Sequence, residues 1–203
     1  MKDQNTTVIT YSKIYQDYAN RNIINRDIKR VLNLFICKLS GKKILDVGCA
    51  GGRDAVYFTS KGFEVLGIDL TPEFIKLAKV NCPEATFNLM DMRKLKFDNE
   101  SFDGVWACAS FLHIPKKDAI KTLSGFNKIL KSKGVLFLSV MEGTGEGYRK
   151  NEKLNWDDRY FSFYQKLELE KLLNSAGFKV ISLIKFPTSW GPKFLEFYCK
   201  VEK

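Results

Sequence analysis

Three glycines between two apolar runs, followed by an acid after the second run, form a pattern that can bind a ligand. The glycines are Gly48, Gly51 and Gly52, and the acid is Asp69. Glycine lets a backbone approach a ligand closely, and the free amides at a helix start attract polar and anionic groups. A carboxylate about 20 residues after such a turn can accept hydrogen bonds from a ribose. The spacing therefore predicts a site for a nucleoside cofactor.

The elements that must position these residues are predicted from the same stretch. Residues 44–47 and 64–68 are apolar enough for buried strands, and residues 53–61 between them fit a helix. A strand, a tight turn, a helix and a second strand make a right-handed crossover with two neighbouring parallel strands. This unit predicts an α/β fold in which the glycine turn and the acid lie at the same edge of the sheet.

The glycine turn has a family resemblance. The run D-V-G-C-A-G-G-R, residues 46–53, resembles motif I of the class I S-adenosylmethionine (SAM)-dependent methyltransferases, which commonly reads D-x-G-C-G-x-G-R. It departs from that motif at Ala50. A dinucleotide fingerprint would need glycine at this position to admit a pyrophosphate. The resemblance covers about residues 40 to 203. It implies a Rossmann-like, doubly wound, mostly parallel seven-stranded sheet of order 3-2-1-4-5-7-6, with helices on both faces.

The resemblance also implies which residues would surround SAM. They belong to the glycine turn, to the strand tips and to an N-terminal helix. The set is Tyr18, Asp46, Gly48, Cys49, Ala50, Gly52, Arg53, Asp69, Leu70, Asp91, Met92 and Ala107. Arg53 would neighbour the methionine carboxylate and Asp69 would hold the ribose hydroxyls. Leu70 and Met92 would enclose the adenine, whose amino group would meet Asp91. Capping of a turn is the alternative role for Asp91.

An aromatic stripe marks the N-terminal helix. Tyr11, Ile14, Tyr15 and Tyr18 lie at i, i+3, i+4 and i+7, which places them on one helical face. Core packing is the simplest role for such residues. In the family that the chain resembles, however, a similar helix lies across the cofactor mouth, which makes Tyr18 a candidate lid contact.

Residues for the methyl acceptor are less clearly marked. His113, the single histidine of the chain, follows the fourth predicted strand and has a side chain suited to proton transfer near neutral pH. It is the candidate catalytic residue, with a structural role as the alternative. Tyr148, Trp156, Tyr160 and Trp190 are candidate acceptor-pocket residues, and core packing is the alternative for each.

Residues 107–110, A-C-A-S, narrow the class of acceptor. Methyltransferases of exocyclic amino groups in DNA carry (D/N)-P-P-(Y/F) after the fourth strand, and DNA cytosine-C5 enzymes carry a P-C-Q nucleophile. The chain matches neither pattern. Cys108 lies at a predicted strand end, where we interpret it as a small buried side chain and not as a nucleophile.

The chain is predicted to form one domain, 1–203, in three parts. The parts are a helical lid (1–40), a cofactor-binding core (41–140), and an acceptor loop with a closing helix and hairpin (141–203). The loop is predicted because residues 141–161 show no clean hydrophobic period and contain three glycines spaced two apart. Loops on a rigid sheet commonly carry substrate specificity.

Composition bounds the partners. The 203 residues carry 33 basic and 23 acidic side chains, a formal charge of +10, which can attract nucleic acid or anionic substrates. The lysines are dispersed along the chain, however, which favours a small-molecule acceptor over RNA. One histidine and five scattered cysteines predict neither a metal site nor a disulfide framework. The lack of a long apolar segment predicts a cytoplasmic protein without a membrane partner, either monomer or homodimer.

These observations predict a SAM-dependent methyltransferase that releases S-adenosylhomocysteine and methylates an unidentified acceptor, with a small molecule preferred. The alternatives are an enzyme that modifies tRNA or another RNA, an NAD(P)-dependent oxidoreductase, and a SAM-binding module without turnover. The oxidoreductase is disfavoured by Ala50 in the turn.

Overall fold

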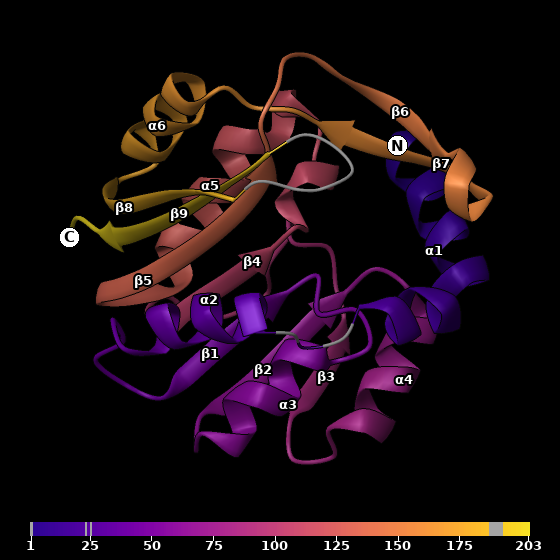
Figure 1. Cartoon of the computed structure of the whole chain (residues 1–203). Coiled ribbons are helices and arrows are strands. Elements are labelled where there is room, and N and C mark those ends of the chain that lie inside the picture. The colour runs from indigo at the N-terminus through magenta and orange to yellow at the C-terminus, as the bar shows by residue number, and fades with distance from the viewer. Residues whose placement is uncertain (1, 23, 25, 187–192) are drawn as a thin grey trace.

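A seven-stranded sheet forms the centre of the molecule in the computed structural model, which describes residues 2–22, 24, 26–186 and 193–203. Its strands are β1 (Lys43–Val47), β2 (Glu64–Asp69), β3 (Thr86–Leu89), β4 (Phe102–Cys108), β5 (Leu130–Met141), β8 (Phe178–Phe186) and β9 (Phe194–Val201). They lie in the order β3-β2-β1-β4-β5-β9-β8 (Figure 1). Only β9 runs antiparallel to its neighbours in this sheet, as its pairings with β5 and β8 show. Numbered by their place in the chain, these strands have the order 3-2-1-4-5-7-6, so the predicted fold class is confirmed.

Helices cover both faces of the sheet. They are α1 (Lys2–Arg21), α2 (Arg26–Ile36), α3 (Arg53–Ser60), α4 (Pro72–Asn81), α5 (Lys116–Ile129) and α6 (Lys166–Ser175), with short 3-10 turns η1 (Phe111–His113) and η2 (Glu152–Leu154). One core packs the inner faces of α2, α3 and α4 against the sheet around Phe35, Phe58 and Trp106. The other core packs α5 and α6 against the opposite face. Burial on both faces explains why residues 104–108 of β4 and 135–141 of β5 are almost entirely apolar.

Local sequence sets the helix starts that frame the site. α3 begins directly after Gly52, whose φ of 81° is in the left-handed region. α4 begins with Pro72 at its first position, where the missing N–H has no intrahelical partner to lose. Both helices thus start at the carboxyl edge of the sheet, next to the tips of β1 and β2. This arrangement places the glycine turn and Asp69 together.

The predicted loop at 141–161 is wrong for most of its length. β6 (Glu146–Asn151) and β7 (Trp156–Ser162) form a separate two-stranded antiparallel sheet. Tyr148 pairs with Tyr160 across it, with ring centroids 5.5 Å apart. Aromatic cross-strand pairs of this kind stabilise a hairpin. Gly147 and the charged residues of β6 hide the alternation of apolar and polar residues by which a strand is recognised in sequence.

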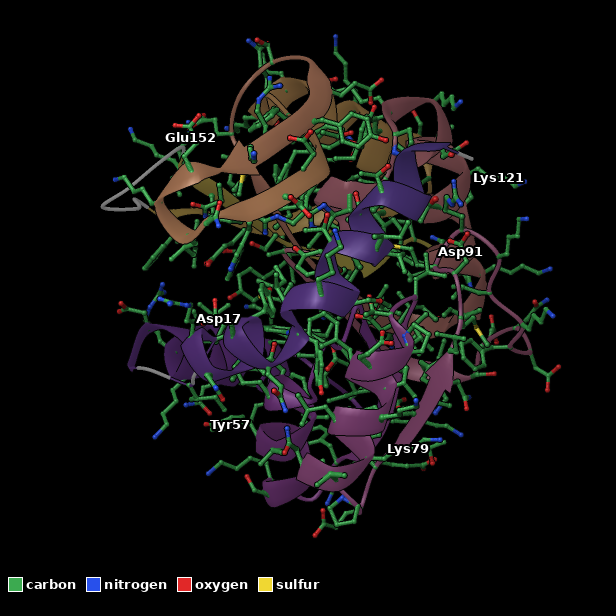
Figure 2. The ribbon with its side chains drawn as sticks, turned by 90° about the vertical axis from the view of Figure 1, so that its right-hand side faces the viewer. Asp17, Tyr57, Lys79, Asp91, Lys121 and Glu152 are labelled. Atoms are coloured by element: carbon green, nitrogen blue, oxygen red, sulfur yellow. The ribbon has the colours of Figure 1, made fainter. Side chains whose placement is uncertain are left out.

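α1 supports this hairpin from the side. The Thr10 hydroxyl donates to the carbonyl of Asp158 at 2.9 Å, and the Tyr160 N–H donates to the Thr7 hydroxyl at 2.9 Å. Two threonines one helical turn apart therefore bind the backbone of β7. Figure 2 shows α1 crossing the molecule between the β6–β7 pair and α4. The N-terminal helix and a hairpin about 150 residues away in sequence together form one cap, Thr7 and Tyr160 being 153 positions apart.

Candidate cofactor and acceptor site

The glycine turn and Asp69 are joined by backbone hydrogen bonds. The Ala50 N–H donates to Oδ2 of Asp69 at 3.0 Å, and the Thr71 N–H donates to Oδ1 at 2.8 Å. Burial raises the pKa of Asp69, while these two N–H groups act in the opposite direction. Ala50 adopts a left-handed φ of 46°, so alanine is accepted in a turn where the family motif has glycine. The carboxylate is thereby fixed at the tip of β2, where a ribose could reach it.

The tips of β1 and β4 meet at Gly48. A Cβ at Gly48 would lie 2.4 Å from the Cβ of Ser110, and the φ of Gly48 is +72°. The Ser110 hydroxyl donates to the carbonyl of Val47 at 2.5 Å. Glycine is therefore required at this position both for its conformation and for the close approach. β1 and β4 are paired in parallel, so their carboxyl ends lie side by side here.

Beneath the turn lies a charged cluster. Arg53 donates through Nε to Asp54 at 2.7 Å and also donates to the side chain of Asn22. The indole N–H of Trp106 donates to Asp54 at 2.8 Å. Burial works to lower the pKa of Arg53, but the attraction of Asp54 outweighs it and the net shift is upward. The guanidinium therefore remains charged.

Asp46 of this cluster is incompletely satisfied. It is buried, and its Oδ2 has no hydrogen-bond partner among the described residues. Burial, together with the charge of Asp54, raises the pKa of Asp46 well above its ordinary value. Buried polar atoms without partners are uncommon and call for an explanation. A ligand with a hydrogen-bond donor at this end of the site, such as an ammonium group, would supply one.

A cavity of about 90 Å³ lies at the carboxyl edge of the sheet, under α1. Its walls come from α1, the glycine turn, the tips of β2 and β4, the start of α4 and the loop before α5. The lining residues are Thr7, Val8, Tyr11, Tyr18, Gly48, Ala50, Ile68, Asp69, Leu70, Thr71, Phe74, Met90, Met92, Cys108, Ala109, Ser110, His113 and Ile114. Small-molecule sites commonly enclose roughly 300 to 1,000 Å³. The cavity as it stands is therefore smaller than a typical small-molecule site, and α1 forms one of its walls.

Seven of the residues predicted for the site line this cavity, and six do not. Those that line it are Tyr18, Gly48, Ala50, Asp69, Leu70, Met92 and His113. Those outside the lining are Asp46, Cys49, Gly52, Arg53, Asp91 and Ala107. Most of the second group sit behind the glycine turn and hold it in place. The polar atoms along this wall, with the unpaired Oδ2 of Asp46 behind it, fit a nucleoside that carries an amino acid.

Asp91 is engaged in a salt bridge and does not reach the cavity wall. Its Oδ2 lies 2.8 Å from Nη2 of Arg93, which also pairs with Asp118 at 3.1 Å. These contacts tie the segment after β3 to the start of α5. Figure 2 labels Asp91 to one side of α1. Met90 and Met92 face the cavity in its place, which is the side-chain alternation expected around an extended strand end.

His113 lies at the other end of the cavity and is bonded through both ring nitrogens. Nδ1 is 2.6 Å from the carbonyl oxygen of Tyr160, which can only accept, so Nδ1 carries the hydrogen. Nε2 therefore accepts from the Tyr11 hydroxyl at 3.0 Å. Burial lowers the pKa of His113 to about 4, and the positive charge of Arg159 acts in the same direction. The imidazole is therefore neutral at physiological pH.

Aromatic rings form the wall between these two ends. Tyr11 and Tyr18 of α1 pack edge to face at 5.3 Å, and both contact Phe74 of α4. Tyr11 and Phe74 were missed as site residues. The helical stripe that contains Tyr18 also contains Tyr11, so the i, i+7 spacing was the available signal. Nothing in the local sequence of Phe74 separates it from the core residues of α4.

Three of the four predicted acceptor-pocket aromatics, Tyr148, Trp156 and Tyr160, are not among the residues that line the cavity. The indole N–H of Trp156 donates to Asp17 at 3.0 Å, and its ring contacts Tyr18 at 5.9 Å. Tyr160 contributes its backbone carbonyl to His113. Tyr148 packs on Tyr160 from β6. Trp190 lies outside the described residues.

Cys108 does line the cavity, at the tip of β4. Burial raises the pKa of its thiol strongly, and the carboxylate of Asp54 adds to the shift. A thiol must be ionised to act as a nucleophile. The group is therefore protonated at neutral pH, in keeping with its interpretation as a small packing residue.

Neither a metal-binding cluster nor a membrane-spanning helix is found in the part of the chain that the structure describes. No group of three or more histidine, cysteine, aspartate or glutamate side chains there could hold a metal ion. None of its helices is long and apolar enough to cross a membrane.

Comparison with known proteins agrees with this geometry. A family model described as a methyltransferase domain matches residues 44–134. An uncharacterized methyltransferase of Synechocystis sp. is 27% identical over 151 residues, which cover 70% of this chain and 68% of that protein. The ubiquinone biosynthesis O-methyltransferase of Haemophilus ducreyi is 32% identical over 119 residues, 54% of this chain. The chain matches about half the length of that second relative.

A solved structure shows the same fold over nearly the whole chain. The 1,6-didemethyltoxoflavin-N1-methyltransferase of Burkholderia thailandensis, crystallised with its 1,6-didemethyltoxoflavin and S-adenosylhomocysteine, has a TM-score of 0.78 at 21% identity. The alignment covers 98% of this chain and 90% of that one. The matched family model, the sheet order and the glycine turn agree. These findings support a class I SAM-dependent methyltransferase with SAM as its cofactor.

Proposed function

We propose that the protein transfers the methyl group of SAM to a small-molecule acceptor that enters beneath α1. The observation that carries this proposal is the covered cavity, with the cofactor residues at one end and His113 at the other. A cap of one helix and one hairpin suits a molecule that can be enclosed. Two of the similar proteins are also named for small molecules, one for ubiquinone biosynthesis and one for 1,6-didemethyltoxoflavin.

The cofactor end assigns roles by position. Asp69 would accept hydrogen bonds from the ribose, and Leu70 and Met92 would flank the adenine. The carboxylate of Asp46 and the backbone around Gly48 would face the methionine part. When bound, SAM supplies a methyl group already activated by its sulfonium. The task left to these side chains is to hold the reacting atoms in line, an effect that can be worth several kcal/mol.

The acceptor end supplies a positioning group and a proton acceptor. Nε2 of His113 is unprotonated, and its hydrogen bond to Tyr11 is one that an incoming hydroxyl or amino group could replace. During methyl transfer the acceptor atom bonds to the methyl carbon, the sulfur keeps the electron pair of the broken bond, and the acceptor proton passes to Nε2. His113 is the residue we assign to this step.

The domain parts follow from these roles. Residues 1–40 contribute the lid helix, residues 41–140 hold SAM, and residues 141–203 supply the hairpin of the cap and close the sheet. We propose that these parts act as one domain. The cap formed by α1 and the β6–β7 pair would determine which acceptors enter.

Calorimetric titration tests the cofactor, and a product assay tests the acceptor. SAM and S-adenosylhomocysteine should bind with micromolar affinity, about −8 kcal/mol, and NAD should not. Formation of S-adenosylhomocysteine should then depend on a member of a panel of phenols and heteroaromatic amines, and His113→Ala should slow it. Binding of NAD in place of SAM would overturn the proposal. Methylation of tRNA without any small-molecule turnover would move the acceptor to RNA, and an unchanged rate in His113→Ala would remove that residue from the chemistry.

A further inference from the structure

Arg159 of β7 is a buried charge that the proposed chemistry does not use. Its residue is 8% exposed, and its Nε has no hydrogen-bond partner among the residues that the structure describes. No salt bridge to Arg159 occurs within the described residues. Taking a charge out of water without a counter-charge is costly, and the structures that keep one generally pair it. This guanidinium therefore has unused capacity to bind an anion.

Aromatic rings surround the guanidinium. Its Cζ lies 5.5 Å from the ring centroid of Tyr11, 5.1 Å from that of Trp156 and 5.2 Å from that of Phe161. Rings attract a cation by their π faces but do not neutralise it. Nη1 donates a hydrogen bond to the Tyr11 hydroxyl at 3.3 Å. The site thus provides a buried positive charge that forms no salt bridge with a carboxylate of the described residues.

The acids nearest in sequence are directed elsewhere. Asp157 pairs with Lys13 of α1 at 2.9 Å. Asp158 is exposed, and as the residue before Arg159 in the strand it points to the opposite face of β7. Across the hairpin, Arg159 is paired in register with Arg149. Like charges placed opposite each other in a sheet are destabilising. The surroundings therefore add positive charge to the site and do not offset it.

Arg159 is separated from the cavity by one side chain. Tyr11 lines the cavity, accepts from Arg159 and donates to His113 through the same hydroxyl. Phe161, the ring beneath the guanidinium, also packs on His113 at 4.8 Å. An acceptor that displaced the Tyr11 side chain would therefore meet Arg159 at the His113 end of the cavity.

We propose that Arg159 binds an anionic group of the methyl acceptor, and that the acceptor is a small aromatic molecule carrying a carboxylate. This rests on the proposed small-molecule methyl transfer. A guanidinium can bind a carboxylate through two parallel hydrogen bonds, and Nε is one of the donors such a pair uses. The rings of Tyr11, Tyr18 and Phe74 offer faces on which a flat acceptor can pack.

The pairing would also assist proton transfer. The charge of Arg159 contributes to the low pKa of His113. A carboxylate bound to Arg159 would offset that charge and bring the pKa of His113 closer to its ordinary value. The base would then become stronger when the acceptor is in place.

Matched pairs of aromatic acids and amides test the inference on the full chain saturated with S-adenosylhomocysteine. The probes are benzoate against benzamide, salicylate against salicylamide, and 3,4-dihydroxybenzoate against its amide, each measured by calorimetry. At least one carboxylate should bind tenfold or more tightly than its amide. Arg159→Gln should abolish that preference. Arg149→Gln, which removes the same charge from the exposed partner position on β6, should retain it.

Two further measurements keep the outcomes separate. Arg159→Lys retains the positive charge but loses the planar guanidinium. It should reduce the preference for the carboxylate over its amide severalfold, and it provides the test if Arg159→Gln does not fold. The inference is overturned if no carboxylate is preferred in the wild-type protein, or if the preference survives in Arg159→Gln. Failure of S-adenosylhomocysteine to bind the wild-type protein would instead defeat the proposed function.

Discussion

The cofactor end and the acceptor end of the cavity are held by different kinds of contact. At the cofactor end, backbone N–H groups from a short turn fix Asp69, and Ser110 packs directly on Gly48. At the acceptor end, side chains from three distant segments meet, as in the hydrogen bonds of Tyr11 to His113 and of Arg159 to Tyr11.

This difference separates what the fold must keep from what it can vary. A turn built from backbone hydrogen bonds accepts few substitutions, because its geometry depends on φ angles and on close approach. A wall built from side chains of α1, η1 and β7 can change one residue at a time without altering the sheet. We expect the first region to define the cofactor and the second to define the acceptor.

The largest effect is expected from Gly48→Ala, which tests the rigidity of the cofactor end. The added Cβ would meet Ser110 at 2.4 Å in a left-handed backbone conformation, so we expect a loss of about 4 kcal/mol in the free energy of unfolding. Urea denaturation measures it. Gly125→Ala in α5 is the control, because its Cβ meets nothing within 4 Å, and it should stabilise by about 0.5–1 kcal/mol. Equal effects at the two glycines would contradict the comparison.

Asp69→Ala should follow in size. It removes the proposed ribose acceptor and leaves the N–H groups of Ala50 and Thr71 without their partner. We expect SAM binding to weaken at least 100-fold, about 3 kcal/mol, by calorimetry. Asp98→Ala, at an exposed turn before β4, should bind SAM normally. Retention of wild-type affinity in Asp69→Ala would remove this residue from the cofactor site.

His113→Gln tests the acceptor end through pH. Since burial lowers the pKa of His113 to about 4 from 6.5, the unfolded chain binds the proton first as pH falls. The neutral ring thus stabilises the fold above pH 6.5, and this contribution is lost between pH 6.5 and 4. We expect the wild type to lose about 2 kcal/mol more than His113→Gln between pH 7 and 4.5. Parallel stability curves for the two proteins would show that His113 titrates normally.

The smallest effect concerns the attachment of the cap. Thr7→Val removes the acceptor of the Tyr160 N–H while keeping the side-chain shape, at a cost of about 1 kcal/mol. Amide hydrogen exchange in α1 and β7 should accelerate about fivefold, with exchange in β1 and β4 unchanged. Ser124→Ala on α5, whose hydroxyl bonds only to its own helix in the contacts described, should leave both regions unaffected. Faster exchange throughout the sheet would mean that α1 is part of the core and not a separate lid.

Sequence reasoning could predict that the glycine turn lies beside Asp69, because the signals in this region are local. The glycine turn and Asp69 lie within about 20 residues, and their neighbours are fixed by the crossover that joins β1 to β2. The acceptor end could not be recovered in this way. The Tyr11–His113 bond spans 102 positions and the Thr7–Tyr160 bond spans 153, and no spacing rule reaches that far.

The missed hairpin has a related cause. Apolar and polar residues alternate only weakly along β6 and β7, because Gly147 and charged residues occupy strand positions. The stability of the hairpin also depends on α1, which lies alongside it. Asp91 illustrates the same limit in the other direction. The resemblance places Asp91 next to the adenine, but its side chain pairs with Arg93, which also pairs with Asp118. Asp91 does not line the cavity.

The position of α1 over the cavity has a consequence for the timing of turnover. If α1 must lift for S-adenosylhomocysteine to exchange for fresh SAM, the hydrogen bonds of Thr7 and Thr10 to β7 would have to break first. Product residence time would then follow the rate at which one helix detaches, and not the strength of the contacts around Asp69. Substitutions on α1 could therefore raise the turnover number while leaving the methyl-transfer step unchanged.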